Sequence, residues 1–407
     1  MLNYEQALAT VLSNTAHAMS EECVALEQSL GRVLSRPIVA DRPLPPFNRV
    51  AMDGLAFKHS DFNPTLPLEI KNEVLAGMEV NNSLAPNQAF HIMTGAALPA
   101  SADTVVQIEH FELQSGELPQ ALLQSGRDYS CGLNIHPVGA DAAKGEELVS
   151  ASSCVTPAQM GVMAAVGSSE VWVKRKPVVN IFSTGDELVA PEDIPTAVQI
   201  RDSNSYVLMS FCQRSGANAK RLGTLKDDLS YLRQHLGQGL AGDILLLSGG
   251  VSAGTHDYIP QVLEELGVTQ VFHKVAIKPG KPLWFGVSDS GVLVFGLPGN
   301  PVSTQVNFNL FVRPVIHQMV GLGLENGDEP KTLRLPISLD WVKRSPRPDQ
   351  FINGKITASE QGMVVLPIHD HGSGDFCSFA KADALIRLSG DRGTTYSAGS
   401  LVEVIRM

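Results

Sequence analysis

Five short segments between residues 183 and 303 hold residue types that could bind a phosphorylated ligand. They combine acids, lysines, glycines and hydroxyl side chains, and each follows or adjoins an apolar run. Their sequences are STGDEL (183–188), KDD (226–228), SGGVSAGTHDY (248–258), AIKPGKP (276–282) and GLPGNPVS (296–303). Carboxylates, ammonium groups and backbone N–H groups together are the means by which proteins hold anions and the metals bound to them.

The segment SGGVSAGTHDY is rich in small residues. Gly249 and Gly250 permit positive φ angles, which turn N–H groups towards an anion. Hydroxyl donors are added by Ser248, Ser252 and Thr255. The segment lacks a basic residue and does not have the spacing of a Walker A loop. On its own such a segment is more often a plain turn. If it binds an anion, the compensating positive charge must come from elsewhere.

The segment AIKPGKP supplies that charge. Pro279 and Gly280 bend the chain between Lys278 and Lys281, so both ammonium groups can face one point. The alternative is two solvated lysines beside a turn. Because apolar residues flank the turn on both sides, we favour a functional role.

The segment GLPGNPVS, which includes Pro298 and Gly299, predicts the start of a helix. Asn300 is a suitable N-cap and Pro301 suits the first helical position, so free N–H groups there would form a second anion site. An ordinary capped helix is the alternative. Pro314 is expected to kink or end that helix.

Four acids belong to the same segments: Asp186, Glu187, Asp228 and Asp257. Carboxylates near a polyphosphate repel it unless a divalent cation lies between them, and Mg²⁺ is held by one or two carboxylates with phosphate oxygens. A helix cap or a surface charge is the alternative for Glu187 and Asp228. The residues therefore predict an enzyme or binding protein for a phosphorylated or nucleotide-bearing anion, with a divalent metal.

The surrounding pattern predicts the elements that carry these segments. Helices are expected at 2–14, 26–34 and 156–166, and short strands over 50–150 indicate a β-rich domain. After residue 176, strands at 177–185, 217–225, 242–250 and 292–300 alternate with helices at 203–215, 228–236, 258–267 and 301–311. This alternation indicates a parallel α/β sheet, whose ligands bind outside the carboxyl ends of the strands. Strand signals without helices from about residue 325 predict a small C-terminal β domain.

Composition narrows the class of protein. The 407 residues carry 31 basic and 42 acidic side chains, a net charge of −11, which argues against a nucleic-acid partner. Five cysteines without a CxxC pair favour reduced thiols in the cytoplasm. Neither a signal peptide nor an apolar run long enough to span a membrane is recognisable, so we expect a cytoplasmic protein with no membrane contact.

Taken in order, these segments resemble the molybdopterin molybdenumtransferases, the family of MoeA and of the gephyrin E domain. Three further stretches carry the resemblance over nearly the whole chain: PPFNRVAMDGLAF (45–57), HIMTGAALPASADTVVQIE (91–109) and SGDFCSFAKADALIRL (373–388).

The resemblance implies a multidomain α/β and β protein that forms an elongated homodimer. Its four domains would be a helical linker or dimerisation domain (1–46 and 141–173), a β-rich domain (47–140), a MogA-like α/β molybdopterin-binding domain (174–324) and a C-terminal β-barrel-like domain (325–407). It further implies transient contact with other molybdenum-cofactor synthesis proteins.

The resemblance also implies an enzyme and its reaction. Adenylylated molybdopterin and molybdate are converted to molybdenum cofactor and AMP, assisted by Mg²⁺ or Zn²⁺. The dithiolene sulfurs capture the metal, and the pyrophosphate bond is cleaved.

Residue roles follow from the matching motifs. The adenylylated pterin and its metal would be handled by Asp186, Glu187, Asp228 and Asp257, of which Asp186, Glu187 and Asp257 would bind the metal. Molybdate and phosphate would be bound by Lys278, Lys281, Arg347 and Ser373. Asp53 and Thr94 would reach the site from the partner subunit, and Asp141 is retained from an acidic family motif. The remaining ligand-binding positions are Ser248, Gly249, Gly250, Ser252, Pro298, Gly299 and Asn300.

The sequence departs from the family pattern where positive charge is expected. Ala140 replaces a glutamate in NIHPVGADAAKG (134–145), the arginines usual there are absent, and PRPDQFINGK (346–355) has one arginine instead of two. Arg49 and Val50 also stand where the family has small residues. These losses leave two alternatives open: a weakened paralogue that carries pterin or molybdate without efficient insertion, or a dimeric scaffold.

Overall fold

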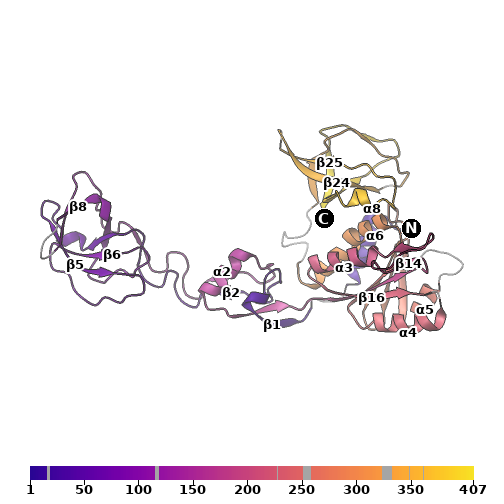
Figure 1. Cartoon of the computed structure of the whole chain (residues 1–407), viewed down its shortest axis with the longest axis horizontal. Coiled ribbons are helices and arrows are strands. Elements are labelled where there is room, and N and C mark those ends of the chain that lie inside the picture. Colours follow the sequence, from indigo (N-terminus) through magenta and orange to yellow (C-terminus); the bar gives the residue numbers. More distant parts are fainter. Residues whose placement is uncertain are drawn as a thin grey trace. The chain divides into compact units, whose positions relative to one another are not determined.

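The computed structural model describes residues 1–15, 19–114, 119–226, 228–250, 258–322, 332–347, 349–360 and 362–407. The chain forms two compact units (Figure 1). We call residues 36–151 and 157–169 the β-rich unit, and residues 1–35, 152–156 and 170–407 the α/β unit. No helix within the described ranges is both long and apolar enough to cross a bilayer.

The centre of the α/β unit is a six-stranded sheet of order β16-β13-β17-β21-β20-β18. Its strands are β13 (Val178–Thr184), β16 (Asn218–Leu225), β17 (Ile244–Ser248), β18 (Val268–His273), β20 (Trp284–Ser288) and β21 (Leu293–Leu297). The four predicted strands, β13, β16, β17 and β21, are parallel, as expected.

The sheet is nevertheless mixed, because β20 runs antiparallel to both of its neighbours. The expectation of a purely parallel sheet was therefore wrong. β18 is antiparallel to β20 and so runs with the parallel strands. Its carboxyl end, from which the lysine segment 276–282 continues, lies at the same edge as the carboxyl ends of β13, β17 and β21. The expected convergence of the loops is preserved.

Helices cover both faces of this sheet (Figure 1). They are α1 (Tyr4–Ser13), α3 (Asn204–Arg214), α4 (Leu229–Gly239), α5 (Ile259–Glu265), α6 (Pro301–Asn307) and α7 (Arg313–Met319). Successive side chains of a strand point to opposite faces. Leu246 accordingly packs in the cluster with α1, α3, α6 and α7, whereas Leu245 and Leu247 pack against α4 and α5.

The helix expected at 26–34 was wrong, and of the two outcomes expected at Pro314, a kink or an end, the end does not occur. The helix expected at 26–34 is only a 3₁₀ turn, η1 (Leu26–Gln28), because Gly31 adopts φ +71° and Val33 and Leu34 form β-bridges. Pro314 does not end its helix. A π-helical turn, η4 (Phe308–Val312), joins α6 to α7, and Pro314 falls at the second position of α7, where a missing N–H is tolerated.

The C-terminal domain is a sheet of order β19-β24-β26-β28-β22, with β25 paired to β24. Its strands are β19 (Ile277–Lys278), β22 (Leu333–Pro336), β24 (Asp349–Ser359), β25 (Gly362–Pro367), β26 (Ala384–Leu388) and β28 (Leu401–Arg406). β19 comes from the lysine segment of the α/β domain and pairs in parallel with β24.

Smaller elements of the α/β unit are α8 (Phe376–Phe379) and the pairs β1 (Glu21–Ala25) with β12 (Glu170–Lys174), β14 (Leu188–Val189) with β15 (Ile200–Arg201), and β23 (Trp341–Val342) with β27 (Thr395–Tyr396).

The β-rich unit holds a six-stranded sheet of order β7-β4-β6-β5-β9-β8, as the run of short strands predicted. The strands are β4 (Gly54–Phe57), β5 (Leu68–Val74), β6 (Gln88–Ile92), β7 (Thr104–Gln107), β8 (Phe111–Gln114) and β9 (Gln120–Leu123). Short pairs are β2 (Ile38–Val39) with β11 (Glu147–Val149) and β3 (Arg49–Val50) with β10 (Ile135–His136). Its 3₁₀ turns are η2 (His59–Asp61) and η3 (Ile108–His110), and its α-helix is α2 (Pro157–Ala165).

An ion pair fixes the first strand of the α/β sheet at its amino end. Arg175 donates two hydrogen bonds to the Asp243 carboxylate, at 2.9 and 3.0 Å, and the N–H of Val178 donates a third at 2.7 Å. Partial burial raises the pKa of Asp243, but the hydrogen bonds from Arg175 and Val178 outweigh it and hold this pKa below its ordinary value. The pair therefore stabilises the fold while Asp243 is ionised.

Asp243→Asn is expected to lower the free energy of unfolding by about 1–3 kcal/mol at neutral pH. Because the folded-state pKa is depressed, the wild-type advantage should be complete above the unfolded carboxyl range, about pH 5, and should disappear as the pH falls through the folded pKa. Urea unfolding of both proteins at several pH values measures this. An advantage that does not change with pH would contradict it.

Candidate functional site

The two described glycines after β17 have the positive φ angles that the sequence permits, but the N–H of Gly249 donates to the carbonyl of Leu297 at 2.9 Å and is not free for an anion. Gly249 and Gly250 have φ angles of +93° and +62°. A Cβ atom at either glycine would lie within 2.6–2.7 Å of the Thr184 hydroxyl oxygen at the end of β13. Two adjacent loops therefore approach so closely that only glycine fits. Ser252, Thr255 and Asp257 lie outside the described residues.

Asn204, at the start of α3, joins two of the predicted loops. Its side-chain amide donates to the Ser248 hydroxyl and to the backbone carbonyl of Gly299, both at 2.8 Å. Gly299 thereby lies against Gly249. The sequence analysis did not single out Asn204, and only its place at the start of the helix expected after the first sheet strand could have suggested it.

Asn204→Ala is expected to loosen both loops and to raise the KM for a ligand held by them about tenfold, because two hydrogen bonds are lost. The KM for a second ligand bound elsewhere in the site should not change. Steady-state kinetics with each substrate varied in turn would measure the difference. Equal changes in both constants would contradict a local role.

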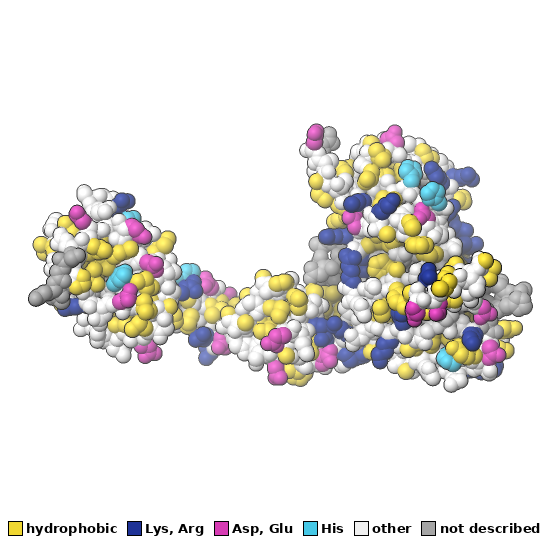
Figure 2. All heavy atoms as spheres, in the orientation of Figure 1, with side chains coloured by type: hydrophobic (Ala, Val, Ile, Leu, Met, Phe, Trp, Pro, Cys, Tyr) yellow, Lys and Arg dark blue, Asp and Glu magenta, His cyan; other side chains and the backbone are white. Residues whose placement is uncertain are grey.

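Four residues that the sequence analysis assigned to anion binding line one cavity of about 460 Å³: Lys278, Lys281, Arg347 and Ser373. Its only acidic lining residue among those described is Asp370, so the formal charge of the lining is +3 − 1 = +2. The protein is acidic overall, yet Lys and Arg side chains are more numerous over the α/β unit than over the β-rich unit (Figure 2). The cavity thus offers local positive charge suited to a small dianion.

Ser373 is held in this cavity by the start of α6. The Asn300 amide donates to the Ser373 hydroxyl at 2.8 Å, and the N–H of Val302 donates to the Ser373 carbonyl at 3.0 Å. The Ser373 hydroxyl is thus an acceptor towards Asn300, and its own proton remains available to an anion. The expected N-cap is correct in position only. The Asn300 side chain makes no cap hydrogen bond, and the Val302 N–H is not free for a ligand.

The lysine turn is supported from two sides. Gly280 has φ +100°, and its carbonyl accepts a 3.0 Å hydrogen bond from the buried Asn307. On the other side, β19 pairs with β24 so that Lys278 lies opposite Gln350. Within the described part of the chain, Lys278 and Lys281 form no ion pair. Both ammonium groups are therefore available to a ligand.

The acids of the site differ in their surroundings. Asp228 caps α4, accepting hydrogen bonds from the Ser230 hydroxyl at 2.6 Å and the Tyr231 N–H at 2.8 Å, and these bonds lower the pKa of Asp228. This is the helix-cap alternative named above. Asp186 and Glu187 are exposed after β13, and the Glu187 carboxylate lies over Gly185.

The described residues contain no group of three or more His, Cys, Asp or Glu side chains arranged around a common metal position. Asp186 and Glu187 nevertheless form no hydrogen bond or ion pair through their carboxylates with the described parts of the chain. Two adjacent free carboxylates at the edge of a ligand site are a donor set that fits Mg²⁺, which takes its remaining oxygens from water and phosphate.

The β-rich unit brings Asp53 and Thr94 together. The Asp53 carboxylate accepts hydrogen bonds from the N–H and the hydroxyl of Thr94, both at 2.7 Å, and these bonds lower the pKa of Asp53. Asp141 lies elsewhere in this unit, 2.9 Å from a ring nitrogen of His136. Asp53 is therefore an exposed, ionised carboxylate in a fixed orientation.

Comparison with known proteins matches three family models in chain order. They are the MoeA N-terminal region (domain I and II) over residues 2–167, a probable molybdopterin binding domain over 180–318, and the MoeA C-terminal region (domain IV) over 334–407. Together they account for nearly all of the sequence.

Individual relatives agree with these models. The molybdopterin molybdenumtransferase of Bacillus subtilis is 34% identical and covers 94% of this chain and 89% of its own length. That of Haemophilus influenzae is 30% identical and covers 99% and 98%. Two crystal structures of a molybdopterin biosynthesis MoeA protein from Pyrococcus horikoshii superimpose on the whole chain, with TM-scores of 0.79 and 0.81 at 31% and 27% identity; they cover 99% and 100% of their own chains.

Proposed function

The chain belongs to the molybdopterin molybdenumtransferase family, and on this premise we propose that it converts adenylylated molybdopterin and molybdate to molybdenum cofactor and AMP. The family resemblance noted in the sequence is confirmed by relatives that match over nearly their full length. The protein acts in molybdenum cofactor biosynthesis as a transferase that inserts molybdenum into molybdopterin.

The observation that carries the proposal is the cavity at the lysine turn. Lys278, Lys281 and Arg347 supply cationic donors, and Ser373 supplies a hydroxyl proton that no residue in the described ranges accepts. Molybdate is a tetrahedral dianion, so its charge matches the formal +2 of the lining, and its four oxygens accept charge-assisted hydrogen bonds. We assign this cavity to molybdate.

The adenylylated pterin is assigned to the neighbouring loops that Asn204 joins. Gly249 and Gly250 have positive φ angles there, which allow a close approach to the ligand, and the exposed carboxylates of Asp186 and Glu187 would hold Mg²⁺. When bound, the metal neutralises phosphate charge. Asn300 lines the cavity and holds the Ser373 hydroxyl, and it belongs to one of the loops that Asn204 joins, so it would connect the pterin site with the molybdate site.

We further propose that the working form is a homodimer in which Asp53 of the partner subunit completes the site. What supports this is the state of the Asp53–Thr94 pair: an exposed, oriented carboxylate within the β-rich unit, whereas the cavity lies in the α/β unit. The proposal accounts for a carboxylate that forms no ion pair with the described residues.

One assay tests the reaction. Purified protein is incubated with adenylylated molybdopterin, molybdate and Mg²⁺, and AMP release and reconstitution of an apo-molybdoenzyme are followed. We expect both to depend on molybdate. Tight pterin binding without AMP release at high molybdate would contradict the proposal and would favour the alternative of a carrier.

A further inference from the structure

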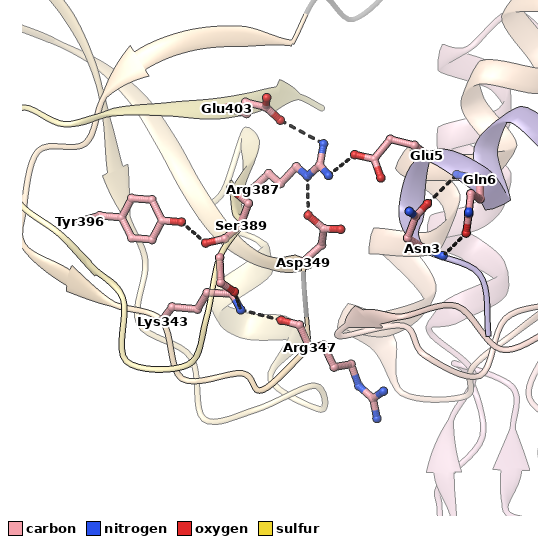
Figure 3. Close-up of polar contacts among 11 residues, drawn as sticks. Asn3, Glu5, Gln6, Lys343, Arg347, Asp349, Arg387, Ser389, Tyr396 and Glu403 are labelled. Atoms are coloured by element: carbon pink, nitrogen blue, oxygen red, sulfur yellow. Dashed lines mark hydrogen bonds and ion pairs between the residues drawn. The ribbon is translucent and has the colours of Figure 1, made fainter.

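Lys343 is a buried lysine whose charge is balanced by backbone carbonyls. The residue is 1% exposed, and its ammonium group donates to the carbonyl of Arg347 at 2.5 Å (Figure 3). It also donates to the carbonyls of Gly390 at 2.7 Å and Ser345 at 3.1 Å. It forms no ion pair with a carboxylate of the described residues. All three ammonium protons are used, which offsets the cost of removing the charge from water.

These bonds close residues 343–347, which we call the arginine loop. The Ser345 hydroxyl accepts from the N–H of Arg347 at 3.1 Å, and the Gln350 side chain accepts from the N–H groups of Arg344 and Ser345 at 3.0 and 2.9 Å. Both polar groups of the Arg347 backbone are therefore bound within the loop. The Lys343 ammonium group is thus the cationic donor in a network that also includes the Ser345 hydroxyl and the Gln350 side chain.

The side chain of Arg347 points away from this centre. In Figure 3 its guanidinium group extends to the opposite side from Lys343, and no contact is marked to it. It lines the cavity with Lys278 and Lys281, and none of the described residues bonds to its guanidinium nitrogens. The loop thus fixes the backbone of an arginine whose charged end is free for a ligand.

The far end of the loop is fixed relative to the lysine turn. Asp349 accepts a 2.7 Å hydrogen bond from Arg387, which also contacts Glu5 and Glu403 (Figure 3). Asp349 pairs with Ile277 in the β19–β24 ladder. Lys343 and this ladder therefore hold the arginine loop from both ends, and Arg347 and Lys278 face the same cavity.

We propose that Lys343 is a positioning residue for molybdate, acting through Arg347. The inference rests on the proposed function, because it takes the cavity to be the molybdate site. Holding the Arg347 backbone restricts the guanidinium to geometries that reach the oxyanion, so less conformational entropy is lost on binding. Without the ammonium group, three carbonyls lose their donor and the loop must rearrange.

Lys343→Met is the direct test, with molybdate dependence of AMP release and calorimetric molybdate binding as readouts. We expect the KM and Kd for molybdate to rise about tenfold, while kcat at saturating molybdate changes less than about twofold. Lys355→Met, which removes an exposed lysine from β24, is the matched control and should change neither constant. A merely structural role would lower the active fraction and therefore kcat, leaving KM unchanged, and would overturn the proposal.

Two milder variants decide the question if Lys343→Met does not fold. Ser345→Ala removes one hydrogen bond to the Arg347 backbone and should raise the molybdate KM about threefold. Lys343→Arg keeps the charge and several donors. It should bind molybdate more tightly than the double variant Lys343→Arg/Ser345→Ala. Unchanged molybdate constants in both single variants would overturn the positioning role.

A double-mutant cycle separates this inference from the proposed function. Arg347→Ala should raise the molybdate KM by itself, and adding Lys343→Met, or Ser345→Ala, should then change it little. If Arg347→Ala leaves the molybdate constants unchanged, the proposed molybdate site is wrong. Two other outcomes would show that Lys343 does not act through Arg347. In the first, Arg347→Ala raises the molybdate constants but Lys343→Met and Ser345→Ala do not. In the second, the effects of Arg347→Ala and of Lys343→Met or Ser345→Ala on the molybdate KM are additive.

Discussion

Lys278→Ala and Lys281→Ala are each expected to lower kcat/KM for molybdate about 100-fold. Each variant removes one of the three cationic side chains that line the cavity. The lining carries a formal charge of +2, which matches the charge of a dianion. Neither ammonium group has an ion-pair partner in the described part of the protein, so its loss should leave the fold intact. The measurement is AMP release against molybdate concentration, with circular dichroism to verify folding.

Lys220→Ala is the matched control for the lysine variants, since Lys220 is exposed on β16 and does not line the cavity. It should behave as wild type. The wild-type KM for molybdate should also rise with ionic strength, because the interaction is between charges. Lysine variants with unchanged kcat/KM would remove the cavity from the mechanism.

A mixture of two inactive proteins is expected to recover activity. Asp53→Ala and Lys278→Ala should each lose about 100-fold or more of the activity, for different reasons. If Asp53 of the partner subunit completes each site, a mixed dimer holds one intact site and one doubly altered site. Half of the dimers are mixed after random reassortment, so co-expression should restore about a quarter of wild-type AMP release.

The control is the double variant Asp53→Ala/Lys278→Ala co-expressed with each single variant. No mixed dimer can then contain an intact site, so activity should stay at background. Size-exclusion chromatography with light scattering establishes the oligomeric state of each sample. Dimers that form but recover no activity in the original mixture would show that Asp53 acts within its own chain or not at all.

Two of the three cationic side chains that line the cavity at the lysine turn were expected from local sequence, and the third was not. Lys278 and Lys281 flank a turn between apolar runs, and the parallel strands imply that carboxyl-edge loops meet. Arg347 and Ser373 came from the family resemblance, because no local pattern connects them to a turn about 70 to 90 residues earlier. Their meeting in one cavity depends on the β19–β24 ladder, and a two-residue strand leaves almost no periodic signal.

The residues that sequence reasoning missed act through distant partners. Lys343 stands in a polar segment and looks like a surface lysine, but it is buried because β24 and the Gly390 turn close over it. Asn204 resembles any residue at a helix start. The Asn300 side chain was expected to cap its own helix, but Ser373, 73 residues further on, provides the better partner. The local sequence pattern predicts which helix, strand or turn holds such a residue. Contacts between distant segments decide what its side chain binds.

The two sheet strands that were missed have a similar cause. β18 shows two buried positions separated by three exposed ones, which fits neither alternation nor a continuous apolar run. β20 follows the proline-rich lysine turn at once, so the turn signal hides its start. Their antiparallel pairing carries the chain out to the carboxyl edge and back, and it is this return that exposes the lysine turn.

The β19–β24 ladder limits how this protein can be divided. Lys278 belongs to the α/β segment by covalent order, but its strand is an edge of the C-terminal sheet. A domain excised before β22 would keep the glycine loops for the pterin, yet its lysine turn would lose the strand that orders it and the arginine that faces it. Residues of both domains line the cavity, so neither domain alone can carry it into another protein. On the proposed assignments, a fragment that keeps only the α/β segment would hold the loops for the adenylylated pterin but would lack part of the molybdate cavity.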